Sequence, residues 1–155
     1  MCAAVLDTPG TVADEPAIRG LDERVRLLLD LGHRADWDAA MAFFAPDAVW
    51  TSVGFGFEDV HGAAAIRDFW IEWYAPYEDV RIETHDVIDL GGGVVVAVIR
   101  QSGRLGDAQS RVAEGVALVY DWSDGLIERV TVYLDIDEGR AAAERLAEER
   151  GRASV

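Results

Sequence analysis

A single charged residue follows a run of apolar residues in the middle of the chain. Residues 94–103 read VVVAVIRQSG, so Arg100 comes directly after six apolar positions. Because arginine is almost never fully buried without a partner, Arg100 is expected to face solvent, a structural partner or a ligand. A hairpin turn centred on Asp107 would place Glu114 directly opposite Arg100, close enough for the two charges to pair.

A second carboxylate is expected near the same arginine. A turn centred on Gly92 places Asp86 opposite Val98, diagonal to Arg100. Burial raises the pKa of a carboxyl and a neighbouring guanidinium lowers it, which is how such a group becomes a general acid or base. Asp86, Arg100 and Glu114 are therefore the candidate catalytic residues. The alternative is a structural ion pair that fixes the strand register.

Alternation along the strands, together with the aromatic residues, supplies a candidate binding surface. Apolar and aromatic walls with a few hydroxyl groups favour a flat and largely apolar molecule, so the expected partner is a small hydrophobic compound. The candidate binding residues are Trp50, Ser52, Trp73, Val98, Ser102, Val116 and Val132.

Neither a metal nor an organic cofactor is expected. The three histidines, His33, His61 and His85, fall on three different predicted elements and show no metal-ligand spacing. The glycine-rich segment GFGFEDVHG has no lysine and no strand-to-helix context, so it does not predict a phosphate site.

These side chains must be positioned by an α+β arrangement. Helical spacing of leucines and valines begins at Leu21 and ends near Gly32, Asp36 suits the N-cap of a short helix over 37–44, and a third helix spans 63–74. The sequence also predicts a strand over 48–53 and four later strands. Short turns join the four later strands and favour antiparallel pairing between them. We therefore expect a cone-shaped, curved antiparallel sheet wrapped around three N-terminal helices, with a C-terminal helical tail. The four strands are predicted at 80–90, 94–105, 110–122 and 125–136.

Bulk composition excludes several classes of partner. The chain has 155 residues and a formal net charge of −15, which disfavours nucleic acid and anionic membrane surfaces. No apolar run approaches the ~18 residues that span a bilayer. The start of the chain lacks the pattern of a signal peptide, and the one cysteine, Cys2, cannot form an internal disulfide, so a cytoplasmic location is expected. We expect a flexible leader over 1–18 and a single domain over 19–150.

Three segments in register resemble a known superfamily. DWDAAMAFFAPDAVW, EDVHGAAAIRDFW and SDGLIERVTVYLDIDEGRAAA resemble the SnoaL-like branch of the nuclear transport factor 2-like superfamily over about residues 20–145. The resemblance implies a cone with an apolar pocket and a homodimer formed through the convex sheet face. An apolar strip is expected to be buried in that dimer, made of Ala97, Ile99, Ala117, Val119 and Tyr133.

The resemblance does not imply one activity, because the superfamily includes isomerases, dehydratases, cyclases, epoxide hydrolases and proteins that only bind. The catalytic positions of the ketosteroid isomerases fall on Ser52, Leu28 and near Val116, and none keeps its chemistry. Of the catalytic residues in the limonene-epoxide hydrolase pattern, this sequence keeps only the arginine, at Arg100. The second aspartate of that pattern falls on Val132. Two hypotheses stay open. One is cofactor-free acid–base chemistry on a small hydrophobic substrate, and the other is a non-catalytic binding or dimeric accessory protein with a structural Arg100–Glu114 pair.

Overall fold

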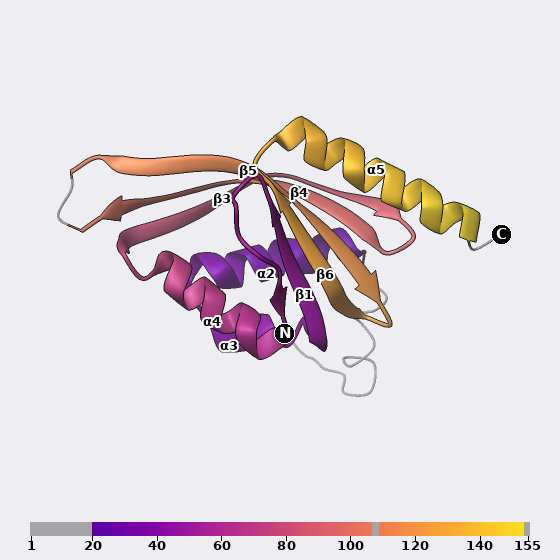
Figure 1. Cartoon of the computed structure of the whole chain (residues 1–155), viewed down its shortest axis with the longest axis horizontal. Coiled ribbons are helices and arrows are strands. Elements are labelled where there is room, and N and C mark those ends of the chain that lie inside the picture. The colour runs from indigo at the N-terminus through magenta and orange to yellow at the C-terminus, as the bar shows by residue number, and fades with distance from the viewer. Residues whose placement is uncertain (1–19, 107–108, 154–155) are drawn as a thin grey trace, which may run out of the picture.

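One mixed sheet separates two layers of helix in the computed structural model, which describes residues 20–106 and 109–153 (Figure 1). The predicted leader over 1–18, including Cys2, lies outside the described residues. Three helices lie on one side of the sheet and α5 lies on the other. The helices are α2 (Leu21–His33), α3 (Trp37–Met41), α4 (Ala63–Tyr74) and α5 (Ile136–Ala153), and the strands are β1 (Phe44–Val53), β2 (Val60–His61), β3 (Tyr77–Gly91), β4 (Val94–Leu105), β5 (Arg111–Ser123) and β6 (Leu126–Tyr133).

Local sequence signals account for most of these boundaries. The backbone nitrogen of Ala39 donates to the Asp36 carboxylate at 3.3 Å, which caps α3 as predicted. This helix is shorter than predicted and ends at Met41, because Phe44 already pairs with Ile127 in the sheet. The strand predicted over 125–136 ends at Tyr133, since the Asp135 side chain accepts a hydrogen bond from the Glu138 backbone and starts α5.

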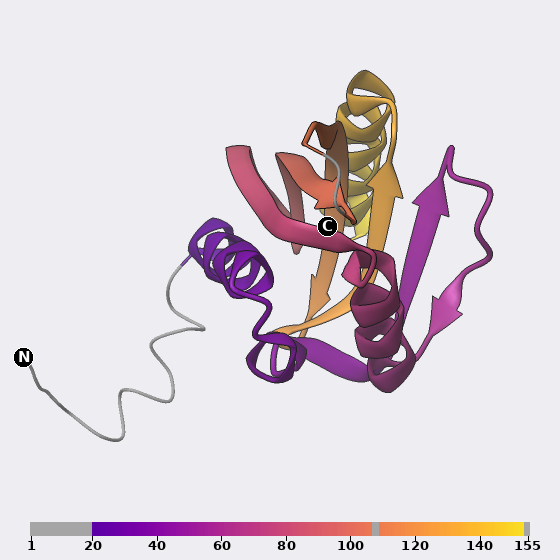
Figure 2. The ribbon, with the colours of Figure 1, turned by 90° about the vertical axis from the view of Figure 1, so that its left-hand side faces the viewer.

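The sheet has six strands in the order β2-β1-β6-β5-β4-β3. The antiparallel meander of β3 to β6 confirms the predicted hairpins, and the curved sheet with helices inside it confirms the predicted fold class. Figure 2 shows the strands fanning around α2 and α4. The prediction did not include the parallel pairing of β1 with β6, in which Trp50 lies opposite Val130. Partners this far apart in sequence leave no local turn signal.

The predicted register between β4 and β5 is wrong by one residue. Arg100 pairs with Gly115, and Glu114 pairs with Gln101. The pair Arg104–Arg111 encloses six residues, an even number, whereas a turn centred on Asp107 requires an odd number. Because successive side chains alternate between the two faces of a sheet, this shift puts Arg100 and Glu114 on opposite faces. The pairing of Asp86 with Val98 is as predicted.

The C-terminal helix packs against the outer, convex face of the sheet. Val119 joins Ala143 of α5 in a small buried cluster, and Tyr133 packs against it. The predicted dimer strip is therefore not a free surface. Its members Ala97 and Ile99 belong to the core on the inner face, and Ala117, Val119 and Tyr133 lie beneath α5.

Candidate functional site

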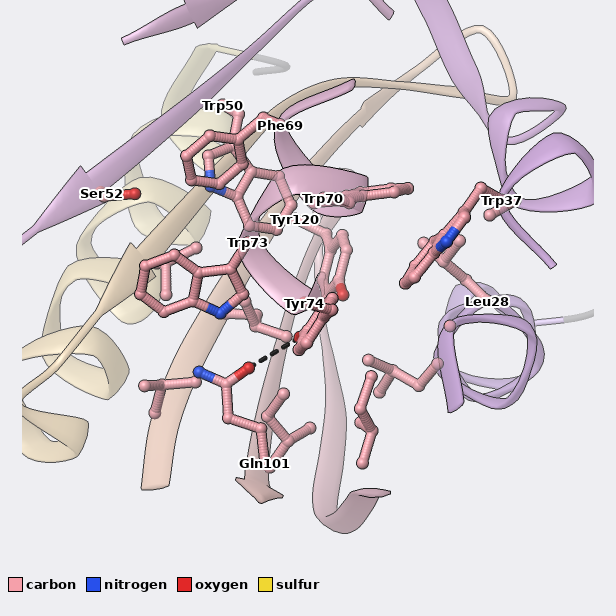
Figure 3. Close-up of a pocket in the computed structure, with 18 of the residues that line it drawn as sticks. Leu28, Trp37, Trp50, Ser52, Phe69, Trp70, Trp73, Tyr74, Gln101 and Tyr120 are labelled. Carbon is pink, nitrogen blue, oxygen red and sulfur yellow. Dashed lines mark hydrogen bonds between the residues drawn. The ribbon is translucent and has the colours of Figure 1, made fainter. Parts of the chain in front are cut away.

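The inner face of the sheet and helices α2 to α4 enclose a cavity of about 90 Å³. Its wall is predominantly apolar and aromatic (Figure 3). Side chains of helices α2, α3 and α4 and of strands β1, β4, β5 and β6 contribute to it. Since about 15 Å³ suffices for one water molecule, the space admits a small organic group. The aromatic residues that line it are Trp37, Phe44, Trp50, Phe55, Phe57, Phe69, Trp70, Trp73, Tyr74 and Tyr120.

Contacts among these rings hold the wall in place. Trp50 meets Trp70 edge-on with 5.5 Å between ring centroids, and Phe69 stacks on Trp73 at 6.2 Å. On the other side, Trp37 stacks almost parallel to Tyr74, with an interplanar angle of 6°. Rings so arranged stabilise one another beyond the area they bury. The aromatic side chains are therefore already held in place before a guest molecule binds between them.

A chain of hydrogen bonds crosses one end of the cavity. The Tyr74 hydroxyl donates to Oε1 of Gln101 at 2.7 Å (Figure 3). Nε2 of Gln101 in turn donates to Oε1 of Glu114 at 3.3 Å. Burial raises the pKa of Tyr74 well above 10.0, and the nearby Glu114 carboxylate raises it further. The phenol is thus a neutral hydrogen-bond donor at physiological pH.

A second phenol lies in the wall without such a partner. Tyr120 is 2% exposed, and its hydroxyl makes no hydrogen bond to any residue that the structure describes. Burial raises its pKa, with a smaller contribution from Tyr74. Its hydroxyl, that of Ser52 and the indole N–H groups of the lining tryptophans make no hydrogen bond to the described residues, so they are free to bind a guest molecule. The Tyr120 oxygen is not among the fully buried unpaired atoms, so it is accessible from the cavity, and a ligand there can accept a hydrogen bond from it or donate one to it.

A second chamber of about 150 Å³ adjoins this end of the cavity. Trp73, Tyr74 and Gln101 line both spaces. The second chamber is more polar, since Glu114 contributes to its wall. The pairing of β3 with β4 shifts register between Glu78 and Arg81, and Val80, which lies within this irregularity, lines the second chamber.

Five of the seven predicted binding residues line the aromatic cavity, namely Trp50, Ser52, Trp73, Val116 and Val132. Val98 does not, because the alternation of β4 points it to the outer face. Ser102 does not line this cavity either. It borders the second chamber, and its hydroxyl oxygen accepts a hydrogen bond from the Arg111 guanidinium at 3.0 Å.

The three predicted catalytic residues are not brought together. Arg100 is exposed on the outer face and forms no ion pair within residues 20–106 and 109–153. Asp86 is bound on that same face by Arg140 of α5 at 3.1 Å. Glu114 alone points to the inner face. The correction follows from the one-residue register shift between β4 and β5.

Three functional candidates were missed from the sequence: Tyr74, Gln101 and Tyr120. Gln101 neighbours Arg100, and the correct hairpin register would have placed it, instead of the arginine, on the inner face. Tyr120 follows from the same alternation, two positions beyond Leu118. Tyr74 ends α4 and carries no signal of its own beyond the aromatic run that precedes it.

Within the described part of the chain, no cluster of three or more histidine, cysteine, aspartate or glutamate residues could hold a metal ion. No helix among the same residues is long and apolar enough to cross a membrane.

Comparison with known proteins identifies the fold and the family. Residues 25–130 match the model of the SnoaL-like domain. The chain belongs to the SnoaL-like family. Because this match covers most of the chain, it confirms the resemblance predicted from the three segments. The family description carries no particular reaction, so the cavity is that of a small-molecule pocket protein whose chemistry must be argued from its own residues.

Solved structures agree on the fold. An LEH-like epoxide hydrolase from M. tuberculosis is 18% identical, with a TM-score of 0.60 over 84% of this chain and 93% of that one. A putative polyketide cyclase from Sinorhizobium meliloti is 23% identical, with a TM-score of 0.57 over 76% and 98%. A hypothetical protein with a ketosteroid isomerase-like fold from Catenulispora acidiphila, solved in complex with trimethylamine, is 17% identical, with a TM-score of 0.63 over 70% of this chain and 82% of that one. Such identities show the fold alone. No curated protein matches the chain.

Leu28, Ser52 and Val116, the positions predicted to match the ketosteroid isomerase pattern, all line the cavity. They present two hydrocarbon side chains and one hydroxyl, so none of the three supplies a carboxylate.

Proposed function

We propose that the protein binds a small, flat and largely apolar molecule in the aromatic cavity, with one polar atom of the ligand hydrogen-bonded to Tyr120. The observation that carries this proposal is a predominantly aromatic and apolar wall in which the Tyr120 hydroxyl makes no hydrogen bond to the described residues. Pockets that combine predominantly apolar walls with a few fixed polar groups are typical of small-molecule sites. Stacked rings on two sides favour a planar guest.

Titration with 2-naphthol, a flat apolar ring system with one hydroxyl, tests the proposal through quenching of the cavity tryptophans. Ser52→Phe places a ring inside the cavity and is expected to weaken binding about tenfold or more, because it displaces the guest. Thr51→Phe adds the same ring one residue earlier, on the opposite face of β1, and is expected to leave binding unchanged. Equal affinities of the two variants would refute the cavity as the binding site.

A second candidate function is acid–base catalysis without a cofactor. The hydrogen-bonded chain from Tyr74 through Gln101 to Glu114 favours it, since it joins a carboxylate to the end of the cavity. A flat ketone such as 2-tetralone should then exchange its α-protons for deuterium faster with the protein than in buffer, and Glu114→Gln should abolish the acceleration. An exchange rate equal to that in buffer would leave binding as the function.

We also propose that the protein forms a homodimer through the part of the convex sheet face that α5 does not cover. Glu83 lies directly opposite Arg100 there, and both are exposed. A two-fold axis would let each pair meet the other with opposite charges. Sedimentation velocity should give a dimer for the natural protein and a monomer for Arg100→Glu. A monomeric natural protein would contradict this proposal.

A further inference from the structure

One carboxylate faces the inner side of the sheet without a cationic partner. Glu114 lines the second chamber, where its Oε1 accepts from the Gln101 amide. No ion pair to Glu114 forms anywhere in residues 20–106 and 109–153. The arginine closest to it along β5, Arg111, is engaged by Asp79 at 2.8 Å and by Ser102. The charge of Glu114 is thus not compensated by the protein.

Aromatic rings surround the same space. Trp73, Tyr74 and Tyr77 line the second chamber together with Glu114. The face of an aromatic ring attracts a cation, and quaternary ammonium groups are commonly bound between such rings. Rings and an unpaired carboxylate together favour a positively charged amine over a neutral group, and they repel an anion. The net charge of −15 draws cations towards the molecule as a whole.

The two chambers adjoin each other along one set of side chains. Trp73, Tyr74 and Gln101 line both, so Glu114 lies just beyond the end of the aromatic cavity. The carboxylate already acts across this boundary, because it raises the pKa of Tyr74 in addition to the effect of burial.

We infer that the ligand of this protein is an amphiphilic amine, with its apolar ring in the aromatic cavity and its ammonium group in the second chamber against Glu114, Trp73 and Tyr77. This inference rests on the proposed binding function, since it names the chemical class of the molecule that the same cavity takes.

An isosteric pair of probes separates charge from shape. Benzyltrimethylammonium carries a permanent positive charge, and neopentylbenzene replaces its nitrogen with carbon while keeping the same outline. Both are titrated by ligand-observed NMR against the natural protein and two variants. Glu114→Gln removes the charge but keeps an oxygen to accept from Gln101. Glu148→Gln removes an exposed carboxylate from α5, on the outer side of the sheet, and serves as the matched control.

The natural protein is expected to bind the ammonium probe about tenfold more tightly than its carbon isostere. Glu114→Gln should reduce that preference to about twofold or less while leaving the affinity for neopentylbenzene unchanged, and Glu148→Gln should retain the full preference. Equal binding of the two probes, or a preference that survives Glu114→Gln, would overturn the amine site and leave the proposed binding function standing. Failure of both probes to bind would refute the proposed function as well.

Discussion

At the scale of single residues, the two buried phenols of the cavity differ in what their hydroxyls do. Tyr74 donates a short hydrogen bond to Gln101, whereas Tyr120 has no partner among the described residues. A hydrogen bond within the protein contributes about 1 kcal/mol to stability, whereas removing a hydroxyl that faces the cavity breaks no bond to the described residues. Replacing tyrosine with phenylalanine is therefore expected to change the free energy of unfolding differently at the two positions.

Tyr74→Phe is expected to lower the free energy of unfolding by about 1 kcal/mol, since Gln101 loses its donor. Tyr120→Phe is expected to leave that free energy unchanged or to raise it, because no bond is lost. Urea denaturation of the two variants measures both. A similar loss in each would mean that Tyr120 has a partner in solution, and it would weaken the case for a hydroxyl waiting for a ligand.

The raised pKa values of the two phenols predict a loss of stability in alkali. An unfolded tyrosine ionises near pH 10.0, whereas Tyr74 and Tyr120 keep their protons to higher pH in the folded protein. Above pH 10 the unfolded state therefore binds fewer protons, so the free energy of unfolding falls as the pH rises. Urea denaturation at about pH 8, 10 and 11 measures the slope. The double variant Tyr74→Phe, Tyr120→Phe should flatten it, and an unchanged slope would assign the effect to other groups.

Residue-level prediction was correct for the turn between β3 and β4 and failed at the turn between β4 and β5. Ser52 and Val132 were placed by alternation together with the family resemblance, and both line the cavity. Arg100 was assigned to the same face through the number of residues in the β4–β5 loop, which composition does not fix. Its neighbour Gln101 took the inner position instead.

At the scale of elements, α5 approaches the sheet so closely that one contact point admits only glycine. A Cβ atom on Gly139 would lie 2.6 Å from Cβ of Ala117 and 3.0 Å from Cβ of Tyr133. Near the other end of the same helix, a Cβ atom on Gly151 would meet nothing within 4 Å. The two glycines are therefore a matched pair within one helix.

Gly139→Ala is expected to lower the free energy of unfolding by about 1–3 kcal/mol, because overpacking costs more than the gain in helix propensity. Gly151→Ala is expected to raise it by about 0.5 kcal/mol, since only the propensity changes. Thermal unfolding followed by circular dichroism gives both signs. Stabilisation by both substitutions would show that α5 does not rest on the sheet in solution.

Element prediction was most accurate where the periodicity was local. The helical spacing of α2 and α4 and the short turns of the meander gave boundaries within a few residues. The two-residue strand β2 was missed because so short a segment has no periodicity. The docking of α5 was missed because its sequence is rich in charge and alanine, and few of its apolar side chains, such as Ala143 and Leu146, pack on the sheet.

At the scale of the whole molecule, the two faces of the sheet differ in what they contact. The inner face lines the cavity, and the outer face is partly covered by α5, so a substitution on one face need not disturb the other. The charge of −15 is spread over both layers, with 29 acidic residues against 14 basic ones. Carboxylates thus outnumber the cations that could pair with them, and their mutual repulsion opposes the compact state.

Salt is therefore expected to stabilise the protein. Screening weakens both the repulsion and the surface ion pairs such as Arg67–Asp38, but exposed pairs contribute little each, so the repulsion dominates. Raising NaCl from about 20 mM to about 0.5 M should increase Tm by about 2–4 °C, equivalent to about 1 kcal/mol. The double variant Glu148→Gln, Glu149→Gln removes two charges from α5 and should reduce the increase. A fall in Tm with salt would mean that ion pairs outweigh the repulsion and that the acidic surface is internally balanced.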